Sequence, residues 1–245
     1  MTTNYPKPPI VEAIIDIQVP LGTAVLTEAE LKTFGELTEG KYPTTTPIRQ
    51  VLFGIDASGL AATGAPQHAN VGWRCSGSGA VVQLKNNGFT FSRLPPYTEW
   101  ESFREEARAA WNQYRRLINP QSIVRYAVRF VNKINIDYSP IELFDYLKLY
   151  PQLPSDIPQD VGGMFMQLRM PQGDLMGNTS ALINVALAPP DGLAKLAIVL
   201  DIDLFCEGEV AISTDEVWTL LDTFRDRKNK LFEGCITDKA RELFK

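Results

Sequence analysis

Residues 123–137, IVRYAVRFVNKINID, decide the fold, because they are the longest strand signal in the chain. Apolar and cationic side chains alternate along them with a period of two, as in a strand that buries one face. We therefore predict a long strand with an apolar face toward a core and a cationic face away from it. The apolar face holds Val124, Tyr126, Val128, Phe130, Ile134 and Ile136, and the cationic face holds Arg125, Arg129 and Lys133.

A similar pattern near the N-terminus, IVEAIIDIQV at residues 10–19, predicts a second strand. Aligning the two segments sets Glu12 against Arg125 and Asp16 against Arg129. If the two strands pair antiparallel about a pseudo-twofold axis, Glu12 lies near Arg129 and Asp16 near Arg125, on the face away from the helices. The two strands therefore predict a set of opposite charges at the centre of a sheet.

Helix starts recur in the same order in both halves of the chain. Capping boxes, in which a hydroxyl and a carboxylate satisfy free amides at a helix start, are predicted at Thr27, Thr98, Ser139 and Ser213. A short helix is predicted from about Thr237. Apolar spacing typical of a helix continues along the last long helix, through Trp218, Leu221, Phe224, Lys228 and Leu231.

Strand signals lie between these helices. In the first half they cover residues 48–56, 71–76, 80–85 and 89–94, and in the second half 164–170, 181–187 and 193–205. Asn87-Gly88 predicts a type I′ hairpin turn, because both central residues of that turn need positive φ. Residues 57–70, which include the only histidine, His68, read as an Ala/Gly-rich loop.

Equivalent signals in the two halves are separated by nearly constant offsets. The strand starts at 10 and 123 differ by 113, and the caps at 98 and 213 differ by 115. We therefore predict an α+β chain in which a β-α-β-β-β-α unit occurs twice, residues 1–120 and 121–245, within a single pseudo-twofold domain. The order of elements resembles the saddle of the TATA-box-binding protein, which implies a curved antiparallel sheet with helices on one face. Such a resemblance carries no function.

Bulk composition excludes several classes of function. The formal net charge of −5 argues against general nucleic-acid binding, which needs concentrated Lys and Arg. No apolar run approaches the roughly 20 residues of a membrane span, and residues 1–9 lack the pattern of a secretion signal. Three widely spaced cysteines predict neither a disulfide framework nor a zinc site. We therefore expect a cytoplasmic protein without cofactors.

Charged side chains gather on the predicted helix-free face. They are Glu12, Asp16, Arg125, Arg129, Lys133, Asp201 and Asp203. One interpretation is a structural ladder of cross-strand ion pairs, each contributing about 0.2–1 kcal/mol. The other is a groove that binds a ligand or partner through Arg125 and Arg129, with carboxylates holding the guanidinium groups.

Asp201-Ile202-Asp203 raises an enzymatic alternative. Two carboxylates at i and i+2 on a strand can hold Mg²⁺ against nucleotide phosphates, as in nucleotidyltransferases. That family also needs a Gly-Ser turn and a helix before the pair, whereas here a Pro/Gly turn at residues 189–192 precedes the strand. Apart from this alternative, the sequence predicts no metal site and no catalytic residue.

Three groups of residues carry a family resemblance: PPIVEA at 8–13, Arg125-Tyr126 with RFVNKI at 129–134, and Phe232-Glu233 with CIT at 235–237. Over nearly its whole length the chain resembles a sporadically distributed family of uncharacterised bacterial proteins. The resemblance implies no catalytic activity. Patchy distribution is typical of accessory genes, such as defence or toxin–antitoxin components.

These observations together predict a non-catalytic binding or interaction protein. Its helix-free sheet face is expected to receive a protein or peptide partner, and self-association into a dimer is one version of this. The alternative is a metal-dependent nucleotide-binding or nucleotidyltransferase-like enzyme that uses Asp201 and Asp203.

Overall fold

The computed structural model describes residues 5–20, 26–55, 62–137, 142–159, 161–211 and 215–245, with the backbone alone for 51–55, 62–68 and 211. Within these residues the chain is α+β, as predicted, with nine strands and five helices. The strands are β1 (Ile10–Gln18), β2 (Thr44–Ile55), β3 (Ala62–Gly77), β4 (Ala80–Lys85), β5 (Gly88–Arg93), β6 (Ser122–Ile136), β7 (Phe165–Pro171), β8 (Asn178–Ala188) and β9 (Leu196–Ala211). The helices are α1 (Glu28–Leu37), α2 (Trp100–Ile118), α3 (Leu143–Tyr146), α4 (Glu216–Cys235) and α5 (Asp238–Glu242).

All nine strands form one antiparallel sheet, in the order β2-β3-β4-β5-β1-β6-β9-β8-β7. The two strands that opened the sequence argument, β1 and β6, are neighbours at its centre, as predicted. Their register sets Asp16 opposite Ala127 and Ile14 opposite Arg129. This pairing places the charged positions of both strands on the same side of the sheet.

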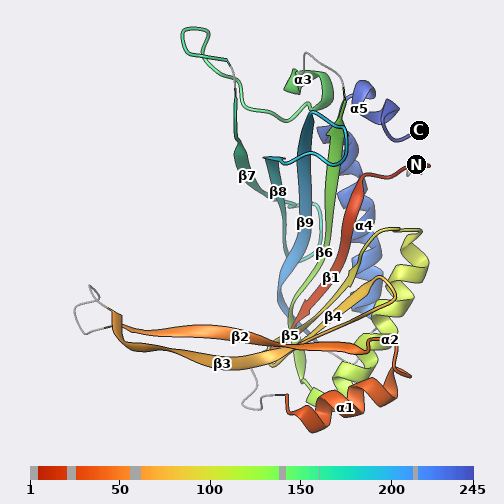
Figure 1. The fold of residues 1–245 in the computed structure, drawn as a ribbon. Coiled ribbons are helices and arrows are strands. Elements are labelled where there is room, and N and C mark those ends of the chain that lie inside the picture. The colour runs from red at the N-terminus through yellow and green to blue at the C-terminus, as the bar shows by residue number, and fades with distance from the viewer. Residues whose placement is uncertain (1–4, 21–25, 56–61, 138–141, 160, 212–214) are drawn as a thin grey trace.

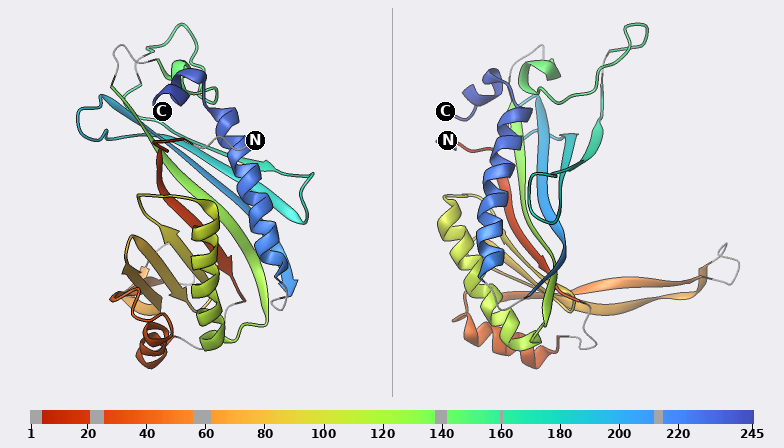
Figure 2. Two further views of the ribbon diagram at one scale, coloured as in Figure 1. Left: turned by 90° about the vertical axis from the view of Figure 1, so that its right-hand side faces the viewer. Right: turned by 180° about the vertical axis from the view of Figure 1, so that it is seen from behind.

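The long helices α2 and α4 cover one face of the sheet (Figure 1). Aromatic side chains fill the layer between them and the strands: Tyr126 of β6 stacks on Phe224 of α4 with ring centroids 5.3 Å apart, and Phe89 of β5 lies 5.7 Å from Trp111 of α2. The other face carries no helix of the described residues, and the long β2–β3 hairpin projects away on that side (Figures 1 and 2). The apolar faces of the strands therefore meet the helices, and their charged faces lie on the open side.

The helix starts agree with the sequence in part. At α1 the Thr27 hydroxyl accepts from the Glu30 amide and the Glu30 carboxylate accepts from the Thr27 amide, which confirms this capping box. The predicted box at Thr98 is wrong, because the residue at the α2 cap is Glu99, without a side-chain cap. Ser139 and Ser213 lie outside the described residues. The short helix after Thr237 is confirmed as α5, and the Thr237 hydroxyl caps it.

The described part of the predicted loop, residues 62–70, is strand, which corrects the sequence interpretation. β3 begins at Ala62 and pairs with β2 up to Ser76, so the backbone of His68 lies in this ladder opposite Val51. The Ala/Gly-rich sequence has weak β propensity. Pairing with β2 supplies the backbone hydrogen bonds that override it.

The β4–β5 hairpin is confirmed, but its turn is not type I′. Lys85 pairs with Gly88, so the connecting residues are Asn86 and Asn87, and neither Asn87 nor Gly88 has a positive φ. Gly88 serves a different purpose, since a Cβ on it would lie 2.8 Å from the backbone oxygen of Ile17 in β1. The glycine allows the close approach of β5 to β1.

Substituting Gly88 tests this role. We expect Gly88→Ala to destabilise the protein by about 1–3 kcal/mol, because the added methyl meets backbone that cannot move aside cheaply. The matched control is Gly35→Ala in α1, where a Cβ would meet nothing within 4 Å. This control should stabilise the protein by up to about 1 kcal/mol through helix propensity. Urea denaturation measures both, and effects of equal sign would contradict the account.

Candidate functional site

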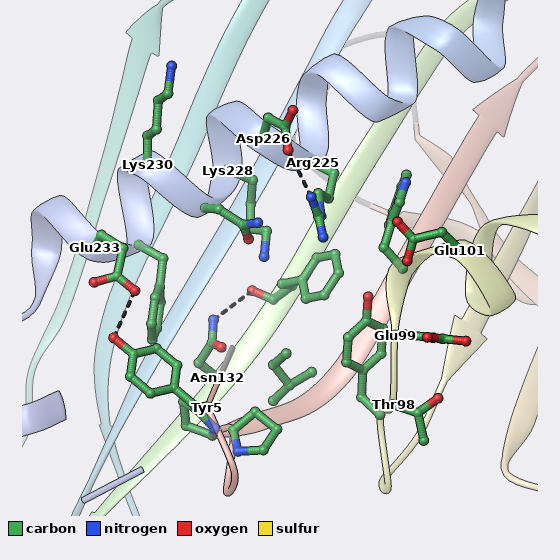
Figure 3. A pocket seen from close by; sticks show the side chains of 18 of the residues that line it. Tyr5, Thr98, Glu99, Glu101, Asn132, Arg225, Asp226, Lys228, Lys230 and Glu233 are labelled. Atoms are coloured by element: carbon green, nitrogen blue, oxygen red, sulfur yellow. Dashed lines mark hydrogen bonds and ion pairs between the residues drawn. The ribbon is translucent and has the colours of Figure 1, made fainter. Parts of the chain in front are cut away.

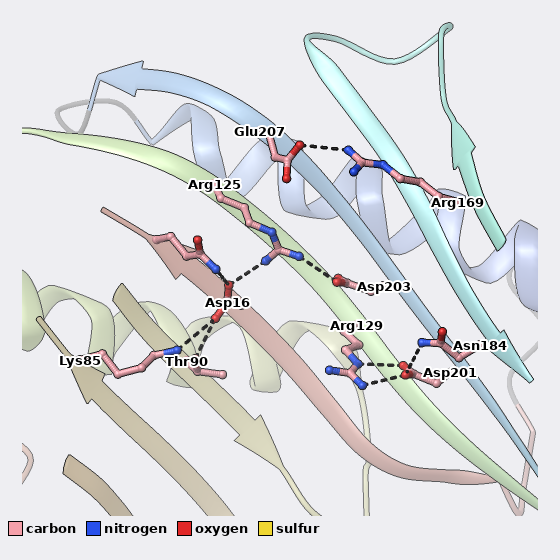
Figure 4. A network of polar contacts seen from close by, with 11 residues as sticks. Asp16, Lys85, Thr90, Arg125, Arg129, Arg169, Asn184, Asp201, Asp203 and Glu207 are labelled. Atoms are coloured by element: carbon pink, nitrogen blue, oxygen red, sulfur yellow. Dashed lines mark hydrogen bonds and ion pairs between the residues drawn. The ribbon is translucent and has the colours of Figure 1, made fainter. Parts of the chain in front are cut away.

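Arg125 is the centre of a polar network on the helix-free face (Figure 4). Its Nη1 donates to Asp16 Oδ1 of β1 at 2.7 Å, and its Nη2 donates to Asp203 Oδ2 of β9 at 2.8 Å. The predicted proximity of Asp16 and Arg125 is therefore confirmed. One guanidinium group ties three neighbouring strands together.

Arg129 forms the second connection, with a partner that the duplication argument did not assign to it. Its Nε and Nη2 donate to the two oxygens of Asp201 at 2.8 and 2.7 Å, the bidentate geometry that suits a guanidinium. Asn184 of β8 donates to the same carboxylate at 3.0 Å. Glu12 lies near enough to Arg129 for its charge to raise the pKa of Arg129, as the predicted proximity implies. The two form no ion pair within the described residues, because Arg129 turns toward β9.

The network extends across much of the sheet. Asp16 also accepts from the Thr90 hydroxyl at 2.8 Å, and Lys85 Nζ lies 3.9 Å from the same carboxylate. Contacts therefore run from β4 to β8. We call the five central residues of this network the arginine–aspartate ladder: Asp16, Arg125, Arg129, Asp201 and Asp203.

Phe205 of β9 lies beside the ladder, between two arginines. The guanidinium carbon of Arg125 is 4.7 Å from its ring centroid and that of Arg169 on β7 is 5.2 Å away. Arg169 also pairs with Glu207 at 3.0 Å. The aromatic ring and the carboxylates thus hold the guanidinium groups in fixed positions.

Lys133, the last of the predicted cations, lies apart from the ladder. Its Nζ donates to Asp191 Oδ1 at 2.6 Å, and Asn135 donates to the other oxygen of that carboxylate at 3.2 Å. These bonds lower the pKa of the Asp191 carboxyl. Lys133 therefore fastens the turn between β8 and β9 to β6.

Burial divides the ladder into hidden carboxylates and an open cation. The side chains of Asp201 and Asp203 are 7% and 13% exposed, whereas that of Arg129 is 44% exposed. Burial raises the pKa of Asp203, although the charge of Arg125 opposes the shift. The buried Oδ1 of Asp203 has no hydrogen-bond partner among the described residues. Hydrogen bonds to Asp201 raise the pKa of Arg129. The ladder presents mainly donors to solvent.

The two aspartates of the enzymatic alternative both face arginines. A metal ion bound between Asp201 and Asp203 would have to displace Arg129 from one and Arg125 from the other. Among the described residues no group of three or more His, Cys, Asp or Glu side chains is placed to hold a metal ion. The observed geometry therefore fits ion pairing directly.

A second candidate site lies on the opposite face, where the helices pack. A cavity of about 1090 Å³ opens between the N-terminal segment, the start of α2 and the middle of α4, with Phe130 and Asn132 of β6 on its floor (Figure 3). Lys228 of α4 reaches into it and is only 5% exposed. Its Nζ lies 3.6 Å from the centroid of the Phe130 ring.

Lys228 is electrostatically unusual. Burial lowers its pKa from the ordinary 10.5 to about 7, and the charge of Arg225 adds to this shift. The described residues provide no ion-pair partner for it. The helical spacing of the sequence places Lys228 in an apolar stripe and does not predict this site. A lysine in such a stripe is itself a signal, because lysine is almost never fully buried without a partner.

Comparison with known proteins adds no assignment. No model of a protein family matches this chain, and no curated protein gives a significant match. None of the helices in the described ranges is long and apolar enough to cross a membrane.

The buried amine predicts a pH-dependent stability. Because its pKa is lowered in the folded chain, the unfolded chain binds an extra proton at this position between about pH 7 and pH 10. Stability should therefore rise with pH in this range, by up to about 1.4 kcal/mol per pH unit relative to Lys228→Met, and the difference should be constant below pH 7. Urea denaturation at several pH values measures the two slopes.

Lys230→Met is the matched control, since it removes a lysine from the exposed side of the same helix. Parallel curves of stability against pH for the wild type and Lys228→Met would contradict the account of the buried amine.

Proposed function

We propose that this chain is a non-catalytic binding protein whose helix-free sheet face receives a protein or peptide partner that supplies carboxylate side chains. One observation carries the proposal: Asp201, the carboxylate that holds Arg129, is 7% exposed, while Arg129 itself remains 44% exposed. A partner approaching this face therefore meets the Arg129 guanidinium before its carboxylate, and it also meets Arg169, which is 53% exposed beside the half-exposed Glu207. Acidic side chains are the groups that guanidinium forks bind best.

Preorganisation supports the proposal. Arg129 is held by two hydrogen bonds to Asp201, and its Nη1 makes none to any described residue. A donor that is already fixed loses little side-chain entropy when it binds a second carboxylate. The ladder therefore offers fixed, open donors in addition to its structural bonds.

An exposed aromatic side chain lies near these cations. Phe165 is 69% exposed, and it is four residues before Arg169 on β7, so both point to the same side of the strand. Aromatic residues and arginine dominate the energetic centres of protein interfaces. β7 is also the last strand of the sheet, so an extended segment of a partner can pair with its free edge.

The duplicated architecture belongs to the same proposal. Residues 1–120 and 121–245 are proposed as fused copies of one unit with the saddle-like order of the TATA-box-binding protein. The sheet order supports this, because β1 and β6 meet at the centre and each is followed outward by the last strand of its own half. Membership of the sporadic bacterial family, a cytoplasmic accessory role and self-association remain predictions from sequence.

Photo-crosslinking tests the proposed face. We expect a photoreactive residue in place of Gln167, exposed on the helix-free side of β7, to yield an adduct with a second polypeptide in the producing cell. The same residue in place of Asn112, exposed on α2, should yield none. An adduct of twice the chain's mass would identify a second copy as the partner.

Arg169→Ala sharpens this experiment, because exposed ion pairs such as Arg169–Glu207 contribute only about 0–1 kcal/mol to stability. It should reduce the Gln167 adduct by about tenfold, the effect of losing about 1.4 kcal/mol of binding. Arg108→Ala, which removes an ion-paired arginine from α2, is the matched control. Adducts from Asn112 alone, or adducts unaffected by Arg169→Ala, would contradict the proposal.

A further inference from the structure

The cavity around Lys228 lies on the helix side of the sheet, so it is independent of the helix-free face proposed to bind a polypeptide. Figure 3 shows the Lys228 amine directed into the cavity above the side chains of β6. On one side it contacts the Phe130 ring. As far as the described residues show, a counter-ion for this amine would have to enter from the cavity.

The described carboxylates around the cavity form no ion pair with Lys228, although the charge of Glu233 partly opposes the lowering of its pKa. Asp226 pairs with Arg225 at 2.9 Å, and Glu233 is held by Arg241 and by the Tyr5 hydroxyl, each at 2.8 Å. Within the described residues no carboxylate oxygen lies within 4 Å of the Lys228 amine. Other titratable groups that line the cavity are Tyr97, Glu99 and Glu101 near the start of α2 and Lys230 of α4.

A buried ammonium without a counter-ion is unfavourable unless it loses its proton or gains an anion. The same position becomes favourable once a carboxylate enters, because the pair then interacts in a medium that screens it weakly. An anionic group placed beside Lys228 is therefore expected to bind favourably in the cavity.

Apolar side chains form about half of the remaining lining. Ile10, Tyr97, Trp100, Phe130 and Phe232 line the cavity together with prolines of the N-terminal segment. A volume of about 1090 Å³ is at the upper end of the range for small-molecule sites. Such walls bind an apolar body, and the single buried amine orients it.

We propose that this cavity binds a small organic acid, with its carboxylate paired to Lys228 and its apolar body against the aromatic walls.

The pairing couples binding to a proton. Burial holds the pKa of Lys228 at about 7 in the free protein, and a bound carboxylate raises it. Above pH 7 each binding event therefore takes up a proton, and affinity falls as pH rises, by at most about tenfold per pH unit. Binding to an exposed, permanently charged arginine would lack this dependence.

The probes are phenylacetate and hexanoate, with phenylacetamide as the neutral match, added to the full chain carrying [ε-¹³C]lysine. The ring current of Phe130 should shift the NMR signal of Lys228 away from those of the other lysines. The signal that disappears in Lys228→Met is assigned to Lys228. At pH 7 we expect a carboxylate to shift this signal with a Kd on the order of 1 mM, as for a ligand of about ten heavy atoms. Affinity should fall about tenfold by pH 8.5, and the amide should not shift the signal.

Lys32→Met, which removes an exposed lysine of α1 outside the cavity, should bind the carboxylate as the wild type does, and Lys228→Met should not. The comparison of acid with amide uses the wild-type chain, so the test does not depend on a variant that folds. The proposal is overturned if neither carboxylate shifts the Lys228 signal, if the amide binds equally well, or if affinity is independent of pH.

Discussion

The antiparallel pairing of β1 with β6 is the constraint on which the rest of the structure depends. Side chains alternate along a strand, so one register sends Ile15, Val128 and their neighbours toward the helices and sends Asp16 and Arg125 to the open side. A slip by one residue would exchange the two faces of a strand. Burial of the apolar face supplies most of the favourable free energy of folding. The ion pairs of the ladder make the register specific, because a wrong register would place charged side chains against apolar ones.

The two faces of β6 contribute to the two proposed sites, one face to each site. Arg129 belongs to the arginine–aspartate ladder, while the next residue, Phe130, lies on the floor of the cavity and contacts Lys228. The cations of the two sites are held in opposite ways. Arg129 is paired and open to solvent, whereas Lys228 is buried and has no partner among the described residues. The first arrangement suits the surface of a partner protein, and the second suits a small anion that leaves water to enter.

Local patterns in the sequence predicted the central strands and the Asp16–Arg125 contact, because a period of two fixes the face of each side chain. They could not predict that Arg129 binds Asp201, since every interior strand has two neighbours and only the sheet order says which one a side chain meets. The strand through His68 was missed because its propensity is weak and its pairing with β2 is a tertiary effect. The spacing of Lys228 predicts packing, since spacing alone does not reveal the cavity between α2, α4 and the N-terminal segment.

A double-mutant cycle on Asp16 and Arg125 tests the central register most directly. The free energy of unfolding is measured for the wild type, Asp16→Asn, Arg125→Gln and the double variant. Both side chains are 17% exposed and lie 2.7 Å apart, so the account expects a coupling energy of about 1–3 kcal/mol. Additive effects, with a coupling below about 0.3 kcal/mol, would show that the two residues do not meet and would contradict the pairing of β1 with β6 in this register.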